Sequence, residues 1–224
     1  MNALAMIKDI GIVPVVRGAT PDRILRIASA LQRGGIPILE ITMETDRALE
    51  ALERAVYKCK DMVIGAGTVL DAETAWRAIA AGAQFIVSPS LTIDVIEVAK
   101  QHHLAMIAGG LTPTEIVTAF QHGADMVKVF PAHVFGPSYI RSLKEPLSHI
   151  PLIATGGIQF KTVVEYIKAG VDAVGVGNAL VTPRDGVSEG QWEEMAVRAA
   201  QWVSVVQTER RKNAKGGSSG KFGR

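Results

Sequence analysis

Eight short aliphatic runs recur along this chain of 224 residues, and the stretches between them carry apolar residues at helical spacing. Ile24, Ile27, Ala28 and Leu31 show this spacing after the first run. Strands that alternate with helices pair in parallel, because each crossover helix returns the chain to the same edge of the sheet. We therefore expect eight parallel strands, at residues 12–16, 36–41, 62–64, 85–87, 105–107, 126–130, 152–154 and 173–176.

Turn residues mark both ends of the predicted helices. Eight βα units in one domain favour a closed (β/α)8 TIM barrel over an open, doubly wound sheet. A short leading N-terminal helix is expected at residues 4–10, and a long last helix at about 189–210, packed on the barrel through Trp192 and Trp202. The helix starts are at Thr20-Pro21, Asp71, Thr112-Pro113 and Gly136-Pro137, and the glycines that end helices are Gly34, Gly82, Gly123 and Gly170.

Composition and charge separate a folded body from a basic tail. The chain is 48% hydrophobic but only 5% aromatic, which predicts the aliphatic core of a parallel sheet. Residues 208–224 contain six basic residues and one acidic residue, so the net charge of +2 arises in this segment. We expect a (β/α)8 domain at residues 1–207 and a disordered, Gly/Ser-rich tail at 208–224. A nucleic-acid or membrane contact of the tail is the alternative, and we expect neither partner.

The single cysteine and the N-terminal segment predict a cytoplasmic protein. Cys59 has no second cysteine with which to form a disulfide, which fits a reducing compartment. Residues 1–6 have neither the basic start nor the apolar stretch of a signal peptide. No apolar run reaches the ~18 residues that a membrane span requires.

Lys128 lies inside an apolar run at residues 126–131, which is predicted to be a buried strand. Burial favours the uncharged amine, because a buried charge without a partner is costly. An uncharged, desolvated amine attacks carbonyl carbons, as it does in enzymes that form Schiff bases. The alternative is a lysine at a strand end whose amine reaches solvent or pairs with a carboxylate.

Polar residues at the carboxyl ends of the strands are the candidates for function, because active sites of (β/α)8 barrels lie there. By strand alternation Glu40 shares a face with Ile38 and Thr42, and Lys128 shares one with Phe130. If both faces point into the barrel, Glu40 and Lys128 are either a structural ion pair or a general acid/base and a nucleophile. The strand-end candidates are Arg17, Glu40, Thr42, Thr68, Ser88, Lys128, Thr155 and Asn178.

Glycines follow the last two predicted strands, at Gly156-Gly157 and at Gly175 and Gly177. In (β/α)8 barrels these two loops frequently bind phosphate through backbone N–H groups at a helix N-terminus. Ordinary turn glycines are the alternative. We expect no metal, since the five histidines lack zinc-like spacing on a strand end, and no dinucleotide, since no G-x-G-x-x-G follows the first strand.

A family pattern lies in eight short segments: PVVR at 14–17, LEIT at 39–42, GAGTV at 65–69, FIVSP at 85–89, LTPTE at 111–115, VKVFP at 127–131, TGG at 155–157 and GVG at 175–177. With these segments in order, residues 4–205 resemble the class I 2-keto-3-deoxy-6-phosphogluconate (KDPG) aldolase family. That family includes 4-hydroxy-2-oxoglutarate (KHG) aldolases and phosphogalactonate relatives.

The resemblance implies that Lys128 forms a Schiff base with a substrate ketone and that Glu40 is the general acid/base. The implied reaction is reversible cleavage of KDPG to pyruvate and glyceraldehyde 3-phosphate, and also of KHG to pyruvate and glyoxylate. It implies a homotrimer without metal or other cofactor, whose partner is a small phosphorylated 2-keto acid. Thr68 and Phe130 would line the pyruvyl pocket. The implied substrate-binding residues are Arg17, Thr68, Pro89, Phe130, Thr155, Gly156, Gly157, Gly177 and Asn178.

Several positions depart from the family pattern, and two of them bear on substrate binding. Some members carry an arginine at the position of Glu44, where it contacts the substrate carboxylate. In this chain, therefore, either Arg17 takes that role or Glu44 points away. Asn178 stands where many members have serine, and its amide can still donate to phosphate.

Three alternative functions stay open from the sequence. The first is an aldolase for the phosphogalactonate epimer, which the sequence does not distinguish from the gluconate. The second is a phosphate-binding barrel isomerase or epimerase, in which Glu40 and Lys128 move protons without a covalent adduct. The third is a non-catalytic barrel, in which the same two residues form a structural pair.

Overall fold

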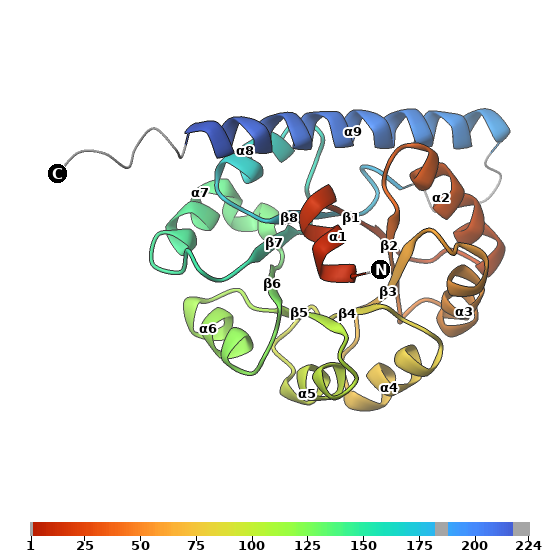
Figure 1. Ribbon diagram of the computed structural model, residues 1–224, viewed down its shortest axis with the longest axis horizontal. Coiled ribbons are helices and arrows are strands. Elements are labelled where there is room, and N and C mark those ends of the chain that lie inside the picture. Colours follow the sequence, from red (N-terminus) through yellow and green to blue (C-terminus); the bar gives the residue numbers. More distant parts are fainter. Residues whose placement is uncertain (1, 182–187, 217–224) are drawn as a thin grey trace.

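The chain folds into a closed barrel of eight parallel strands, each followed by a helical connection (Figure 1). This computed structural model describes residues 2–181 and 188–216. Each strand pairs with its neighbours in sequence, and the last pairs back to the first, so the predicted (β/α)8 TIM barrel is confirmed. The strands are β1 (Ile12–Val16), β2 (Ile38–Thr42), β3 (Val63–Gly67), β4 (Phe85–Val87), β5 (Ala105–Gly109), β6 (Met126–Val129), β7 (Leu152–Thr155) and β8 (Ala173–Val176).

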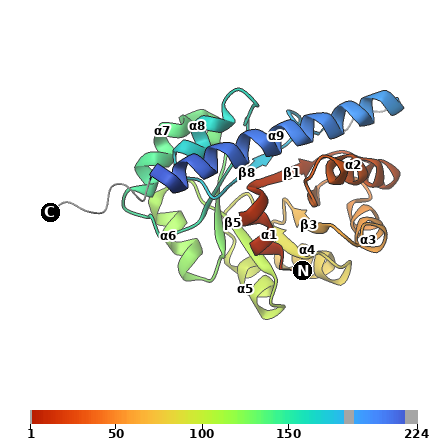
Figure 2. The same ribbon diagram turned by 45° about the horizontal axis from the view of Figure 1, so that its top comes forward.

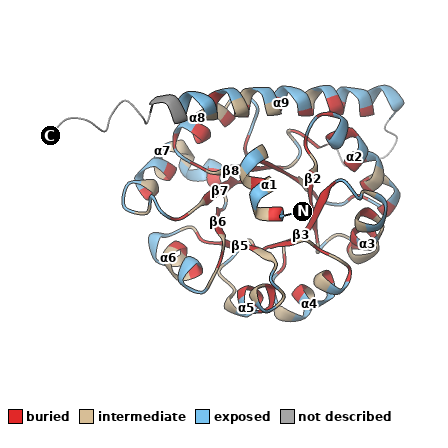
Figure 3. Ribbon diagram, viewed as in Figure 1, coloured by how far each residue is buried: buried red, intermediate tan, exposed pale blue. Residues whose placement is uncertain are grey.

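Helices surround the strands, and the side of each helix that faces the strands is buried (Figure 3). The predicted leading helix, α1, lies across the centre of the ring in Figure 1 and ends just before β1, so it covers the end at which the strands begin. The helices are α1 (Ala3–Ile10), α2 (Pro21–Arg33), α3 (Ala48–Lys58), α4 (Ala72–Ala80), α5 (Ile93–Gln101), α6 (Pro113–Gln121), α7 (Ala132–Lys144), α8 (Val163–Lys168) and α9 (Glu189–Gly216).

The predicted helix boundaries have physical causes in the structure. The Asp71 carboxylate accepts a hydrogen bond from the Thr74 N–H at 2.7 Å, and Thr112 forms a capping box with Glu115. Gly136 lies inside α7, where its non-helical backbone (φ 72°) separates two helical stretches. The predicted helix start at Gly136-Pro137 is therefore the start of the second stretch of α7.

The long helix α9 packs on helices from both the N-terminal and the C-terminal parts of the barrel. It packs along α2 and α8 (Figure 2), and its own Trp192 and Trp202 are buried, as predicted. Near its end, Arg210 donates to the backbone carbonyls of Lys8 and Asp9, and Gln207 also donates to that of Asp9, so α9 satisfies carbonyls at the end of α1. The prediction of disorder from residue 208 is therefore wrong for residues 208–216; the rest of the tail lies outside the described residues.

Among the helices of residues 2–181 and 188–216, none combines the length and the hydrophobicity that a membrane span requires.

Candidate active site

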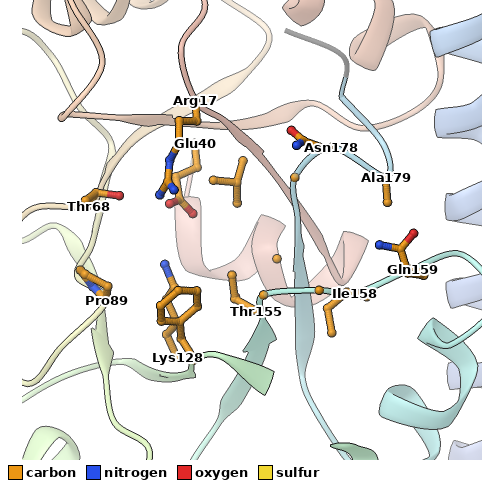
Figure 4. A pocket seen from close by; sticks show the side chains of 16 residues that line it. Arg17, Glu40, Thr68, Pro89, Lys128, Thr155, Ile158, Gln159, Asn178 and Ala179 are labelled. Carbon is orange, nitrogen blue, oxygen red and sulfur yellow. The ribbon is translucent and has the colours of Figure 1, made fainter. Parts of the chain in front are cut away.

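A cavity of about 530 Å³ opens at the carboxyl ends of the strands (Figure 4). Every residue predicted to act in catalysis or substrate binding lines it: Arg17, Glu40, Thr68, Pro89, Lys128, Phe130, Thr155, Gly156, Gly157, Gly177 and Asn178. Gly175, one of the glycines expected at a phosphate site, also lines it, and the sequence argument did not select four further lining residues, Val15, Ile158, Gln159 and Ala179. Each of these lies within two residues of a predicted one, and strand-end position alone does not show which side of a loop faces the cavity.

Glu40 is a carboxyl group buried at the inner surface of the barrel. It lies on β2 opposite Val15 of β1 and Gly65 of β3, and only 2% of it is exposed. Its Oε1 atom is buried without a hydrogen-bond partner. Burial raises the pKa of the Glu40 carboxyl above its ordinary value, and the positive charges of Lys128 and Arg17 oppose that rise. A carboxyl in this state is suited to exchanging a proton with a ligand.

Lys128 enters the same cavity from β6. It pairs with Gly109 and Ile153 on the neighbouring strands, and 5% of the residue is exposed. The Nζ atom lies 5.3 Å from the centroid of the Phe130 ring, within the range of a cation–π contact. In Figure 4 the side chain extends from β6 toward the carboxylate of Glu40.

Lys128 and Glu40 face each other without pairing directly. Among the residues that the structure describes, no ion pair joins the two side chains, so the structural pair considered from the sequence is not formed. The positive charge still acts on the carboxyl electrostatically. The amine and the carboxyl are thus both available to a ligand between them.

A glycine turn after β7, the strand next to β6, forms another part of the cavity wall. Gly156 (φ 95°) and Gly157 (φ 70°) follow β7 in the left-handed region, which other residues rarely adopt. The carbonyl of Gly156 accepts a hydrogen bond from the N–H of His133 at 3.1 Å, and the His133 ring packs against Gly157. Helix α8 begins only at Val163, so the turn does not lie at a helix N-terminus as the sequence argument expected. Its backbone lines the cavity, as Asn178 does, and remains suited to an anion.

Two strand-end candidates, Thr42 and Ser88, do not line the cavity. The Thr42 hydroxyl donates to the carbonyl of Val16 at 3.1 Å, and the Ser88 hydroxyl donates to that of Ser90 at 2.9 Å. Both side chains are fully buried. They satisfy backbone groups at the bends between strand and loop, which strand position alone does not reveal.

Glu44 pairs with Arg17 at the mouth of the cavity. The distance from Arg17 Nε to Glu44 Oε1 is 2.5 Å. Arg17 lines the cavity, whereas Glu44 does not. The sequence left two possibilities, that Arg17 takes the role of the missing arginine or that Glu44 points away. In the structure Arg17 faces the cavity, and Glu44 lies outside the cavity lining and contacts Arg17.

Gly67 gives Glu40 its space, which yields a prediction. A methyl group at position 67 would lie 1.9 Å from Glu40 Oε1, so the carboxylate must leave its position in Gly67→Ala. Displacing a reacting group by about 1 Å commonly lowers the rate about 100-fold, and we expect a loss of kcat of that order in steady-state assays. Gly190→Ala, where the added methyl makes only an ordinary contact with Ser188 Oγ at 3.9 Å, is the control and keeps full activity. Full kcat in Gly67→Ala would show that the position of Glu40 is not important.

Among the described residues, no group of three or more His, Cys, Asp and Glu side chains could hold a metal ion.

Comparison with known proteins agrees with this geometry. The sequence profile of the family described as "KDPG and KHG aldolase" matches residues 4–198. The 2-dehydro-3-deoxy-phosphogluconate aldolase of Treponema pallidum (strain Nichols) is 32% identical over 201 residues, which are 89% of this chain and 95% of that protein. The 2-dehydro-3-deoxy-6-phosphogalactonate aldolase of Escherichia coli (strain K12) is 33% identical over 196 residues, 87% of this chain and 93% of that one.

One similar solved structure holds a covalent intermediate. The KDPG aldolase of Legionella pneumophila, with pyruvate captured as a covalent carbinolamine, superposes with a TM-score of 0.82. Its sequence is 28% identical, and the match covers 89% of this chain and 97% of that chain. The likeness thus extends over almost the whole barrel, including the strand ends that form the cavity.

Proposed function

Because this chain belongs to the family of KDPG and KHG aldolases, we propose that it is a class I aldolase that cleaves KDPG to pyruvate and glyceraldehyde 3-phosphate. The observation that carries the proposal is the arrangement of Lys128 and Glu40. A buried amine and a buried carboxyl enter one cavity from different strands without forming an ion pair. Such a pair supplies a nucleophile and a proton carrier on either side of a bound ketone.

The proposed reaction begins at Lys128. Its uncharged amine attacks the C2 ketone, and loss of water from the carbinolamine gives an iminium ion. Glu40 takes the proton of the C4 hydroxyl, the C3–C4 bond breaks, and its electrons pass to the iminium, which becomes an enamine. The aldehyde leaves first. Protonation of the enamine carbon and hydrolysis of the resulting iminium then release pyruvate and restore the amine.

Arg17, Thr68, Pro89 and Phe130 surround the amine end of the cavity, where we propose that they hold the pyruvyl part of the substrate. An arginine there matches a carboxylate, and the Phe130 ring, 40% exposed, offers an apolar surface beside the amine. The distal phosphate, in this proposal, is held by backbone N–H groups at the glycines that line the same cavity, together with Thr155 and Asn178; these residues are Thr155, Gly156, Gly157, Gly177 and Asn178.

A direct comparison of three substrates tests this function. We expect cleavage of KDPG, with a kcat/KM about tenfold or more above that for KHG, because only the phosphorylated acid reaches the glycine turn. In Gly157→Ala the added methyl meets the His133 side chain at 2.4 Å, so the preference for phosphate is expected to shrink. The 6-phosphogalactonate epimer is the third substrate, since the E. coli relative is named for it. Cleavage of none of the three would refute the proposal.

We propose that the enzyme acts in the cytoplasm, as a homotrimer, in the Entner–Doudoroff pathway. The family resemblance supports the trimer, and the single cysteine fits a reducing compartment. Size-exclusion chromatography with light scattering measures the number of subunits.

A further inference from the structure

Arg17 and Glu44 lie on two different loops that a chain of hydroxyl groups holds together. The Thr42 hydroxyl donates to the carbonyl of Val16, the residue before Arg17. The Thr45 hydroxyl accepts from the N–H of Gly18, the residue after Arg17, at 2.9 Å. The two threonine oxygens are 3.1 Å apart and hydrogen-bond to each other.

The order of the protons in this network follows from its geometry. Thr42 gives its only hydroxyl proton to Val16, so Thr45 must donate to Thr42. Every hydroxyl is then satisfied, and the backbone on both sides of Arg17 is tied to the loop that carries Glu44. Thr42 is fully buried, so its hydrogen bonds are made away from competing water. The clamp formed by Thr42 and Thr45 thus fixes the two backbones from which the ion pair extends.

Glu44 contacts the Arg17 guanidinium at Nε. This contact is made on the side of the guanidinium away from its two terminal nitrogens. In Figure 4 the guanidinium points into the cavity, above Glu40. Arg17 lines the same cavity as Glu40 and Lys128, and its charge lowers the pKa of the Glu40 carboxyl whereas the charge of Glu44 raises it.

We propose that Glu44 is a positioning residue: it orients Arg17 so that the terminal nitrogens of the guanidinium receive the carboxylate of a 2-oxo acid. The inference rests on the proposed function, because Lys128 must bind the ketone next to that carboxylate. This role explains why an acidic residue stands close to a site that binds an anion: Glu44 acts on the anion only through Arg17. Without Glu44, the long and 66% exposed Arg17 side chain would sample many conformations outside the cavity.

The sign of one measurement separates this role from simple electrostatics. Glu44→Gln removes a negative charge near the bound anion, so repulsion alone predicts that less pyruvate is needed for half-saturation. Positioning predicts the reverse. We expect the pyruvate concentration for half-maximal trapping by borohydride to rise about three- to fivefold, the usual range of an exposed ion pair, with an unchanged maximal rate.

Four variants complete the test. Glu50→Gln removes a charge that pairs with Arg47 and Arg54 instead, and it is the control for charge alone. In an Arg17→Gln background, Glu44→Gln is expected to have no further effect. Thr42→Val, which cannot form the clamp, is expected to weaken pyruvate binding, and Thr42→Ser to restore it.

Each outcome decides the proposal. An unchanged or lower half-saturating concentration in Glu44→Gln overturns it, and so does a full effect of that change in the Arg17→Gln background. If the unaltered protein is not trapped by pyruvate at all, the proposed function fails, and this inference fails with it. Trapping of the unaltered protein together with tighter binding in Glu44→Gln refutes only the positioning role.

Discussion

Replacing Lys128 with methionine is expected to lower kcat by roughly 10⁴-fold or more, the scale seen when a covalent nucleophile is removed. Methionine has a similar shape but no amine, so it cannot form the iminium that accepts electrons from the C3–C4 bond. The fold should remain, because a thioether is more easily buried than an amine at a site with 5% exposure. Steady-state kinetics measure the loss, and thermal unfolding measures the stability.

Lys161→Met is the matched control for this change. Lys161 is exposed and does not line the cavity, so its variant keeps the activity of the unaltered protein. Substantial aldol cleavage by Lys128→Met would mean that the reaction proceeds without the Schiff base. The isomerase or epimerase alternative would then regain support, since it uses Lys128 only to move protons.

Replacing Glu40 with glutamine is expected to lower kcat about 10²- to 10⁴-fold, the usual contribution of a general acid/base. The amide cannot take the C4 hydroxyl proton, but Lys128 can still bind pyruvate. Burial raises the pKa of Glu40, so the acid side of the pH profile of kcat/KM should lie above the range of an ordinary glutamate. The variant is expected to lose this limb, and an unchanged limb would exclude Glu40 as the base.

The same substitution has a predicted effect on stability. A carboxyl whose pKa is raised by folding binds its proton more tightly in the folded state, so stability falls as pH rises from the ordinary glutamate pKa through the raised one. Glutamine does not titrate, so the stability of Glu40→Gln does not fall over this pH range. We expect the variant to be more stable by about 1 kcal/mol at neutral pH, the scale for a buried group without a partner, and equal at acid pH. Glu53→Gln, an exposed control, should show neither effect.

The barrel follows from the sequence because the alternation of strands and helices leaves few other topologies. The carboxyl ends of two strands were not predicted correctly: β3 continues to Gly67 and β5 to Gly109, beyond the aliphatic runs at 62–64 and 105–107 that predict them. Glycine ends the apolar pattern at both places, although the backbone pairing continues. At Gly67 the missing side chain is what admits the Glu40 carboxylate.

Features that depend on contacts between segments far apart in the chain could not be predicted from the sequence. The end of α9 is fixed by Arg210 at the carbonyls of α1, about 200 residues away in the chain. The role of Thr42 depends on a hydrogen bond to β1, and the contact of Arg17 with Glu44 depends on two loops meeting. Strand-end position does predict Lys128 and Glu40, since in a closed barrel that position alone brings both to one cavity.

The central claim is that Lys128 forms a Schiff base, and trapping with pyruvate and borohydride tests it most directly. The reductant converts the iminium to a stable amine, and mass spectrometry of the digested protein locates it. We expect one reduced pyruvyl group per chain, on the peptide that contains Lys128, and none in Lys128→Met. No adduct, or an adduct at another lysine, would contradict the account.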